Sequence, residues 1–273
     1  MPVGRKMRTV ILGGRGFLGS ALAKRLPEAL AVGSADVDLI QPTAVEKLRG
    51  LVREGDALVF ASALTPDKGK DARTTMKNLA MGEHVAAVAD KFSYIVYVSS
   101  DAVYADDENP VRETSCASPT TLYGLMHLMR ERMLLVGKTP VMIIRPCAMY
   151  GTGDTHNSYG PNRFMRTAMK DRVIQLFGQG EEQRDHLHVN DCARLIELCL
   201  KERRTGILNA ATGKAVSFME VAQQVAGIVG GVEVKGQPRT GPITHRHFDI
   251  TEMIKAFPAF QFTPLAEGLR SMR

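Results

Sequence analysis

The sequence predicts an α/β fold with a doubly wound parallel sheet and a smaller C-terminal lobe. Short apolar runs alternate with segments whose apolar residues recur at helical spacing, which is typical of parallel strands joined by helices. The first apolar run ends in a glycine-rich turn that opens a helical segment. Hydrophobic residues make up 44% of the 273 residues, which is enough for a sizeable core.

Five β-rich apolar runs predict the strands of the sheet, at residues 7–12, 29–32, 56–61, 94–98 and 141–145. Helical spacing between them predicts helices at residues 20–26, 43–52, 76–90 and 123–136. The first helix stops before Pro27 and the last strand before Pro146. Because helices lie between successive strands, we expect both faces of the sheet to be covered.

The pattern loosens in the second half of the chain. Residues 149–163 are rich in Gly, Asn, Asp and Pro and predict a long functional loop. One clear helix follows at residues 218–228, before turn-rich sequence. We expect one domain over residues 7–146, which also receives strands from residues 173–210, and a discontinuous lobe over residues 147–273.

Composition argues against several classes of protein. No apolar run approaches the roughly 20 residues of a membrane helix, and the basic N-terminus precedes too short an apolar stretch for a signal peptide. The four cysteines form no C-x-x-C pair and predict free, mostly buried thiols in a reducing cytoplasm, with no metal site. The Lys and Arg residues behind the net charge of +6 are scattered, which favours a polyanionic small molecule such as a dinucleotide or sugar nucleotide over nucleic acid.

Three glycines follow the first strand and open the first helix: Gly13, Gly16 and Gly19. Glycines in this setting allow a tight turn, close approach of the backbone to a pyrophosphate and close helix–strand packing. The amides at the start of the helix, around Phe17 and Leu18, then hold the phosphates. The pattern predicts a dinucleotide-binding loop of the Rossmann type, with a purely structural turn as the alternative.

The choice between NAD and NADP depends on the end of the second strand, where an acid usually binds the ribose of NAD. Ser34 lies closest to that position, and Asp36 comes later. Arg15 inside the glycine loop can meet a 2′-phosphate, or it is simply solvated. These observations give a weak preference for NADP. Small residues follow the third strand, where the backbone should pass near the cofactor: Ala61, Ser62 and Ala63.

A tyrosine with a basic residue four positions later, Tyr123 and His127, predicts a reaction centre on one helical face. A tyrosine can exchange a proton with a substrate oxygen while hydride moves to or from carbon. Its reference pKa of about 10 calls for a nearby cation that stabilises the phenolate. Ser100, after the fourth strand, can hydrogen-bond the same oxygen. An ordinary pair on a helix surface is the alternative.

Motifs recur across nearly the whole chain. The early and central ones are Gly13-x-x-Gly16-x-x-Gly19, Ser99-Ser100-Asp101-Ala102-Val103-Tyr104, Pro119-x-x-x-Tyr123-Gly124, Glu131 and Arg145-Pro146-x-x-x-Tyr150-Gly151. The late ones are Arg184-Asp185-His186-Leu187-His188-Val189-Asn190-Asp191 and Pro264-Leu265-Ala266-Glu267-Gly268-Leu269. Together they resemble the extended short-chain dehydrogenase/reductases, in particular the sugar-nucleotide epimerase/dehydratase group. The resemblance implies a Rossmann domain that binds NAD(P) and a lobe that grips a nucleoside diphosphate sugar.

By this resemblance Ser100 matches the catalytic serine or threonine and Tyr123 the acid–base tyrosine. His127 stands where the family has a lysine, which anchors the nicotinamide ribose and lowers the pKa of the tyrosine. An imidazole is shorter and only partly charged at neutral pH. Three outcomes are open: His127 takes over both tasks, it holds the ribose only, or the chain is a catalytically weak binder.

Several residues are candidates for the substrate. Arg184 matches an arginine that faces the diphosphate in the family, and Arg246 is a second phosphate candidate. Asn157 and Arg163 lie in the long loop and should border the sugar or the nucleotide. Thr65, after the third strand, and Asp101, beside Ser100, should also reach the substrate. For each of these residues the alternative is an ordinary solvated or turn residue.

The sequence therefore favours an NAD(P)-dependent keto-sugar reductase that acts on a nucleotide-linked sugar. Dehydration is disfavoured because Ser100-Asp101-Ala102 lacks the glutamate that the family's 4,6-dehydratases carry there. An epimerase that keeps its cofactor bound and a non-catalytic dinucleotide sensor are the alternatives. We expect a cytoplasmic homodimer, since family members often pair through two helices from each subunit.

Overall fold

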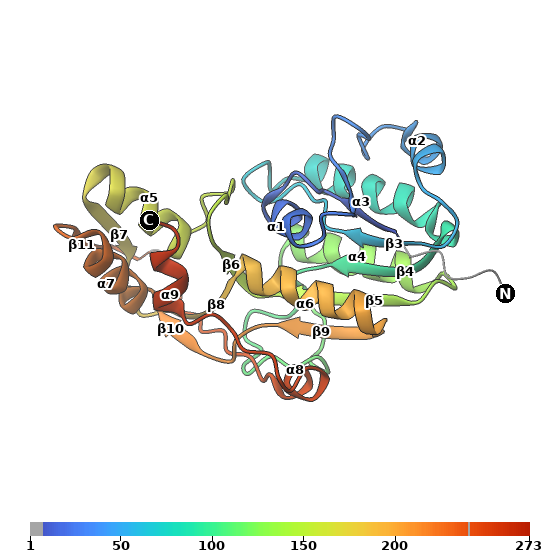
Figure 1. Cartoon of the computed structure of the whole chain (residues 1–273). Coiled ribbons are helices and arrows are strands. Elements are labelled where there is room, and N and C mark those ends of the chain that lie inside the picture. Colours follow the sequence, from blue (N-terminus) through green and yellow to red (C-terminus); the bar gives the residue numbers. More distant parts are fainter. Residues whose placement is uncertain (1–7, 240) are drawn as a thin grey trace. The chain divides into compact units, whose positions relative to one another are not determined.

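A six-stranded sheet has the strand order β2-β1-β3-β4-β5-β9 and adds β9 from late in the chain to five earlier strands (Figure 1). The computed structural model describes residues 8–239 and 241–273. The strands are β1 (Thr9–Leu12), β2 (Leu30–Val32), β3 (Asp56–Phe60), β4 (Phe92–Val98), β5 (Val141–Pro146) and β9 (Gly206–Ala210). The pairs from β2 to β5 are parallel. The predicted α/β fold with a parallel sheet is confirmed.

Helices connect these strands and are α1 (Phe17–Arg25), α2 (Ala44–Leu51), α3 (Ala72–Ala86), α4 (Leu122–Leu135) and α6 (Val189–Glu202). Helices α3 and α4 pack against each other, and α1 and α6 are joined by an ion pair between Arg25 and Glu197. Short 3₁₀ turns are η1 (Ala89–Lys91) and η2 (Asp101–Val103). The core between the layers includes Val10, Leu58, Ile95 and Ile143, all fully buried.

Local capping explains where the predicted ends differ. Helix α1 begins at Phe17 rather than residue 20, because the glycine turn ends at Gly16, its N-cap. Helix α3 begins at Ala72 rather than residue 76, because the Asp71 carboxylate accepts a hydrogen bond from the Thr74 amide at 2.7 Å. Residue 7, where the first predicted strand begins, and the basic N-terminus lie outside the described residues.

The chain divides into two compact units. Unit 1 holds the chain up to Ala105 together with Cys116–Arg145 and Cys192–Leu208, and unit 2 holds Asp106–Ser115, Pro146–Asp191 and Asn209–Arg273. Residues 106–115 thus belong to unit 2, whereas the predicted boundary at residue 146 assigns them to the first domain. The backbone explains this, since Val111 and His247 are hydrogen-bonded at 2.8 Å and Asp249 donates to Val111 at 2.9 Å.

Unit 2 contains a three-stranded sheet with the order β10-β8-β6 and a parallel pair of β7 and β11. Its elements are β6 (Ala148–Tyr150), α5 (Pro161–Asp171), β7 (Val173–Phe177), β8 (Gln183–His188), β10 (Ala215–Ser217), α7 (Phe218–Val229), β11 (Glu233–Gln237), α8 (Thr251–Ala256) and α9 (Leu265–Arg270). Of the strands expected from residues 173–210, only β9 joins the large sheet. The expectation fails for β7 and β8, which pair inside unit 2.

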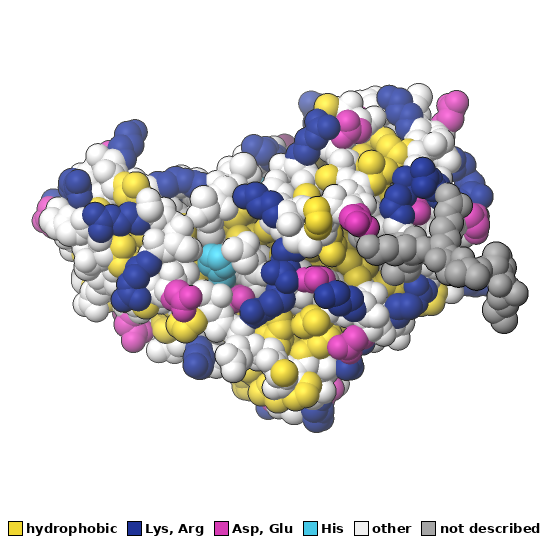
Figure 2. Space-filling view, in the orientation of Figure 1, with side chains coloured by type: hydrophobic (Ala, Val, Ile, Leu, Met, Phe, Trp, Pro, Cys, Tyr) yellow, Lys and Arg dark blue, Asp and Glu magenta, His cyan; other side chains and the backbone are white. Residues whose placement is uncertain are grey.

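Side-chain chemistry at the surface agrees with the scattered charge of the sequence. Figure 2 shows Lys and Arg side chains distributed over the visible face of both units, with acidic side chains between them. The four cysteines are free thiols, and three of them are buried. Among the helices that the structure describes, none has the length and apolar character needed to cross a membrane.

Candidate active site

The glycine loop between β1 and α1 has the geometry of a phosphate cradle. Gly13 has a φ of +88°, and a Cβ there would lie 2.9 Å from the Ala61 backbone. A Cβ on Gly19 would lie 2.0 Å from the Gly13 oxygen, so α1 approaches the turn more closely than any side chain allows. No side chain of the described residues caps α1, and its first turn carries no acid. The amides around Phe17 and Leu18 are therefore suited to an anionic ligand such as a pyrophosphate.

Arg15 and Asp36 meet at the end of β2. The Arg15 Nη2 lies 3.0 Å from the Asp36 Oδ1, and the Asp36 Oδ2 accepts a hydrogen bond from the Gly33 amide at 2.8 Å. The side chain of Ser34 lies in the same turn and is exposed. In the sequence, Asp36 comes later than the position of the acid that usually binds the ribose. The turn after β2 folds its carboxylate back to the end of that strand. The guanidinium expected to meet a 2′-phosphate already has a carboxylate partner.

Hydrogen bonds from α3 and α4 hold the segment that follows β3. The Asn78 side chain binds both backbone groups of Leu64, at 2.8 and 2.9 Å. The Ser62 carbonyl accepts a hydrogen bond from Arg130 at 2.9 Å. Ala61 and Ala63 are partly buried in this segment, and the Thr65 hydroxyl donates to Asp67 at 2.6 Å. The backbone beside the glycine loop is therefore held in one path.

Ser100 lies at the end of β4, next to Ser99, whose side chain belongs to a buried hydrogen-bond network. The Ser99 hydroxyl donates to the Glu131 carboxylate at 2.6 Å, and Arg145 binds the same carboxylate through two nitrogens at 2.9 and 2.6 Å. This fork ties β4, α4 and β5 together. The Ser100 Oγ accepts from the Ala102 amide at 3.2 Å and lies 3.4 Å from the Asp101 carboxylate.

Tyr123 lies in the first turn of α4, next to Ser100. The Thr121 hydroxyl caps the helix by accepting from the Gly124 amide at 3.1 Å. A Cβ on Gly124 would lie 1.9 Å from the Ala102 oxygen, so only glycine lets α4 approach η2 this closely. Burial, followed by the charge of Asp101, raises the pKa of Tyr123 to about 12, and a hydrogen bond with Ser100 opposes the rise. In the free protein Tyr123 is a protonated phenol.

His127 is 2% exposed and packs edge-on against Tyr123, with ring centroids 4.6 Å apart. Its Nδ1 lies 2.7 Å from the Tyr97 hydroxyl. Burial, and then the charge of Arg130, lowers the pKa of His127 well below its usual value. A neutral imidazole cannot supply the cation expected to stabilise the Tyr123 phenolate. The structure thus disfavours the first of the three outcomes, in which His127 replaces the lysine in both tasks.

Sequence reasoning missed Arg130, whose side chain is fully buried one turn beyond His127. Its guanidinium donates to the Asn78 carbonyl at 2.8 Å and to the Ser62 carbonyl at 2.9 Å, and it lies over the Phe60 ring. It also interacts with the Tyr97 hydroxyl. The available clue is spacing, because an arginine seven positions after Tyr123 shares the buried face of the helix.

Tyr123 also borders a cavity of about 510 Å³ in unit 1, a size typical of small-molecule sites. Its lining combines apolar, hydroxyl and amide side chains with one lysine: Leu64, Pro66, Gly69, Lys70, Thr74, Thr75, Asn78, Ala102, Thr121, Leu122, Tyr123 and Met126. In the described part of the chain, no group of three or more His, Cys, Asp or Glu residues is arranged to hold a metal ion.

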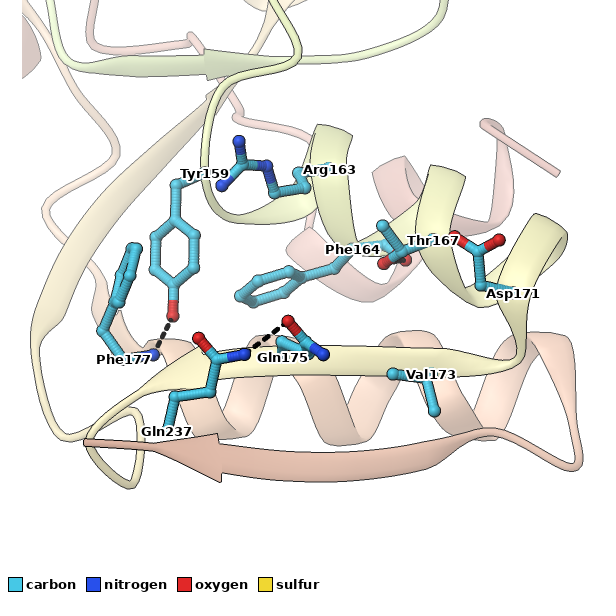
Figure 3. Close-up of a pocket in the computed structure, with 9 residues that line it drawn as sticks. All are labelled: Tyr159, Arg163, Phe164, Thr167, Asp171, Val173, Gln175, Phe177 and Gln237. Carbon is cyan, nitrogen blue, oxygen red and sulfur yellow. Dashed lines mark hydrogen bonds between the residues drawn. The ribbon is translucent and has the colours of Figure 1, made fainter. Parts of the chain in front are cut away.

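Unit 2 has a cavity of its own, of about 400 Å³, between α5 and the β7–β11 pair. Figure 3 shows Arg163 from α5 beside Tyr159, with Phe177 and Gln237 from the paired strands. The Phe177 amide donates to the Tyr159 hydroxyl at 2.9 Å, and the Gln237 amide donates to Gln175 at 2.5 Å. Tyr159 contacts Phe177 with ring centroids 4.8 Å apart, so the wall of the cavity is aromatic.

The two candidate phosphate arginines of unit 2 are neighbours, joined by a parallel backbone bridge between Arg184 and Arg246. Arg184 donates to the Thr244 hydroxyl at 2.9 Å, and Arg246 is 8% exposed and pairs with Asp106 at 3.4 Å. Asn157 instead lies in the exposed turn before α5, with a φ of 52°, and accepts from Arg166 at 3.0 Å. The candidates of unit 2 therefore fall into two groups rather than one.

The comparisons with known proteins place these features in a family. A model described as "NAD dependent epimerase/dehydratase family" matches residues 9–211. The chain belongs to this family. The resemblance found in the motifs is confirmed.

Two curated relatives carry different activities in their names. The chain is 31% identical over 147 residues to a dTDP-L-rhamnose 4-epimerase of Burkholderia thailandensis, which covers 50% of this chain and 40% of the relative. It is 30% identical over 141 residues to a dTDP-4-dehydro-6-deoxy-D-allose reductase of Streptomyces bikiniensis, covering 48% and 41%. The matched stretch thus spans less than half of either relative.

Solved structures show the same fold at low identity. A UDP-glucose 4-epimerase of Thermus thermophilus with NAD has a TM-score of 0.83 at 21% identity and covers 97% of both chains. A Pseudomonas aeruginosa structure named RMD, with NADPH, has a TM-score of 0.84 at 20% identity and covers 98% of this chain and 97% of the other. Of these two structures of the same fold, one holds NAD and the other NADPH.

Proposed function

We propose that this chain is an NAD(P)-dependent oxidoreductase of nucleotide-linked sugars, and that it reduces a keto-sugar. The observation that carries the proposal is the meeting of Tyr123, Ser100 and His127 at one end of α4, in the unit that also holds the glycine loop. A protonated phenol beside a hydroxyl is what a reduced carbonyl oxygen needs.

Nicotinamide, when bound, supplies the hydride. Tyr123 then gives its proton to the carbonyl oxygen, and the Ser100 hydroxyl holds that oxygen by a hydrogen bond. His127 holds the ribose through its buried Nε2, which has no hydrogen-bond partner among the residues described. The orphaned nitrogen and the glycine cradle are the features of this chain that fit the cofactor.

Unit 2 has groups of its own that suit a nucleotide. The aromatic wall and the amides of Gln175 and Gln237 suit a nucleobase, with Arg163 beside them. The neighbouring Arg184 and Arg246 suit a diphosphate, because planar guanidinium groups bind phosphate through two nitrogens. Thr65 and Asp101 are proposed to contact the sugar.

The Tyr123→Phe variant tests the proposal. It removes the proton donor and keeps the ring, so turnover of a keto-sugar nucleotide should fall at least 1000-fold, about 4 kcal/mol of barrier, while NAD(P)H binding stays nearly unchanged. Both are followed by NAD(P)H absorbance and by calorimetric titration. Wild-type turnover retained in the variant would contradict the acid–base role.

A sugar-nucleotide epimerase is the second candidate, favoured by the name of the Burkholderia relative. It predicts tightly held NAD in the purified protein and conversion of a nucleotide sugar without net consumption of added NAD(P)H. Net consumption that matches the product favours the reductase. Cofactor binding without turnover of any nucleotide sugar favours the non-catalytic sensor.

The weak preference for NADP stays a prediction, because it requires Arg15 to leave Asp36 and bind the 2′-phosphate. We also propose a homodimer. Large apolar side chains are 41–64% exposed on α3 and α4 at Met76, Leu122, Leu125, Met129 and Leu135. Sedimentation of the Leu125→Glu/Met129→Glu variant should give monomers, whereas Ile254→Glu on α8 should leave a dimer.

A further inference from the structure

We propose that Arg130 supplies the positive charge that stabilises the Tyr123 phenolate, and that His127 works beside it as an uncharged imidazole whose Nε2–H donates to the bound cofactor. The inference rests on the proposed function, because that function gives Tyr123 its acid–base role. It assigns to two residues the work first expected of His127 alone. Arg130 is a positioning residue here, since it acts through Tyr123.

The polarity of the hydrogen bonds fixes the protonation of His127. A neutral tyrosine hydroxyl carries one proton, and when it is buried that proton needs an acceptor. Tyr97 is fully buried, and the His127 Nδ1, 2.7 Å away, is the acceptor its hydroxyl proton reaches. Nδ1 is therefore unprotonated, and the proton of the neutral ring is on Nε2. That nitrogen is buried and has no partner in the described part of the chain.

Burial makes a second cation at this place costly. Arg130 is held by the carbonyls of Asn78 and Ser62 and by the Phe60 ring, and arginine keeps its proton in proteins. A charged group at position 127 would lie one helical turn away on the same buried face. Histidine avoids this repulsion by staying neutral. Gly82 leaves room for the arginine, since a Cβ there would lie 2.7 Å from the Arg130 Cγ.

The charged and titratable groups around the pair are few. Tyr123 is acted on by Asp101 from η2, Asp67 from the loop after β3 and Arg130 from its own helix. Of these three groups only Arg130 favours the phenolate. His127 is acted on by Arg130 and contacts Tyr97 from β4. Glu131, which acts on Tyr97, is neutralised by Arg145.

Nuclear magnetic resonance of protein labelled with ¹⁵N-histidine tests the inference without any turnover. In the wild type, His127 should carry its proton on Nε2 and show no titration between pH 5.5 and 8.5. In Arg130→Met its titration should move to higher pH, whereas Arg130→Lys should leave it as in the wild type. Arg132→Met, an exposed arginine on the same helix, is the matched control and should change nothing.

The pH profile gives the second readout. In Arg130→Met, oxidation of the sugar alcohol should slow about tenfold or more at every pH from 7 to 9.5, since one unit of pKa is a factor of ten. Reduction should slow less, because the phenol is already protonated. Arg130→Lys should restore most of the oxidation rate.

Several results would overturn the inference. They are a wild-type His127 that titrates near pH 6.5, a proton on its Nδ1, and an Arg130→Met variant that behaves as Arg132→Met does in both measurements. If Arg130→Met does not fold, Tyr97→Phe replaces it and should allow a proton onto Nδ1; no change of tautomer would count against the inference. Failure of the wild type to turn over any nucleotide sugar contradicts the proposed function instead.

Discussion

Tyr123 is a phenol whose surroundings oppose its ionisation, and this sets the pH dependence of the reaction. Burial raises its pKa to about 12, so the phenolate fraction grows tenfold for each unit of pH below that value. We predict that kcat/KM for oxidation rises about tenfold per unit from pH 7 to 9.5, while reduction stays flat. Initial rates in both directions check this. A plateau in the oxidation profile below pH 8 would contradict it.

We expect Asp36 to influence which dinucleotide the chain prefers. Its carboxylate pairs with Arg15 at 3.0 Å and repels a 2′-phosphate. In Asp36→Asn the guanidinium is released, so the ratio of NADP affinity to NAD affinity should rise at least tenfold, measured by titration calorimetry. The control is Asp38→Asn, whose carboxylate binds Ile40 and Gln41 instead. An equal rise in the control would show that the pair has no part in specificity.

At the residue scale, the spacing of four positions is sufficient to predict that Tyr123 and His127 lie on one helical face. Ser100 comes from the end of β4 and is matched to this pair by the family resemblance. Spacing cannot predict the charge of His127. That property depends on Arg130 and on Tyr97, which a different strand brings to the ring. Asp36 was missed for a related reason, since the turn after β2 folds its carboxylate back to the Gly33 amide.

At the element scale, the position of the start of α4 depends on Gly124, which has no side chain. The Gly124→Ala substitution would put a Cβ 1.9 Å from the Ala102 oxygen and 2.8 Å from Pro119. Helix and turn must then move apart, which separates Tyr123 from Ser100. We predict a fall in kcat of about 100-fold and a loss of about 1–3 kcal/mol of stability, measured by turnover and by urea unfolding.

Gly50→Ala is the control for this prediction, since a Cβ there meets nothing within 4 Å. It should keep full activity and, if anything, gain stability from the helix propensity of alanine. A Gly124→Ala variant with unchanged kcat would mean that the helix start tolerates displacement.

Regular elements with strong periodicity were predictable, and irregular ones were not. The strands of the large sheet are continuous apolar runs, so their sequence reports burial on both faces. Strand β8 carries charged and imidazole side chains and has no such pattern. Helix α5 begins at Pro161, directly after a segment that reads as loop, and a proline there is compatible with the first turn of a helix as well as with a loop.

At the scale of the whole molecule, buried histidines limit stability in acid. Burial lowers the pKa of His186 to about 3, against about 6.5 in the unfolded chain. Between these values the unfolded state binds more protons, so stability falls as pH falls, by about 1.4 kcal/mol per unit for this group. Unit 2 should therefore lose about 2 kcal/mol between pH 6.5 and 5 through His186 alone.

The His186→Phe variant lacks this titrating group. Its melting temperature should therefore fall less between pH 7 and pH 5 than the melting temperature of the wild type does, as scanning calorimetry measures. His245→Phe, at an exposed position, should follow the wild type. If the melting temperatures of all three proteins fall equally between pH 7 and pH 5, groups other than His186 cause the loss of stability.

The bare beginning of α1 has a consequence for the life of the protein in a cell. Among the described residues no side chain caps this helix, and amides at a helix start suit a bound anion. Ligand present at a hundred times its dissociation constant adds about 2.7 kcal/mol to the folded state. We therefore expect newly made chains without a bound dinucleotide to be degraded faster than chains that hold one.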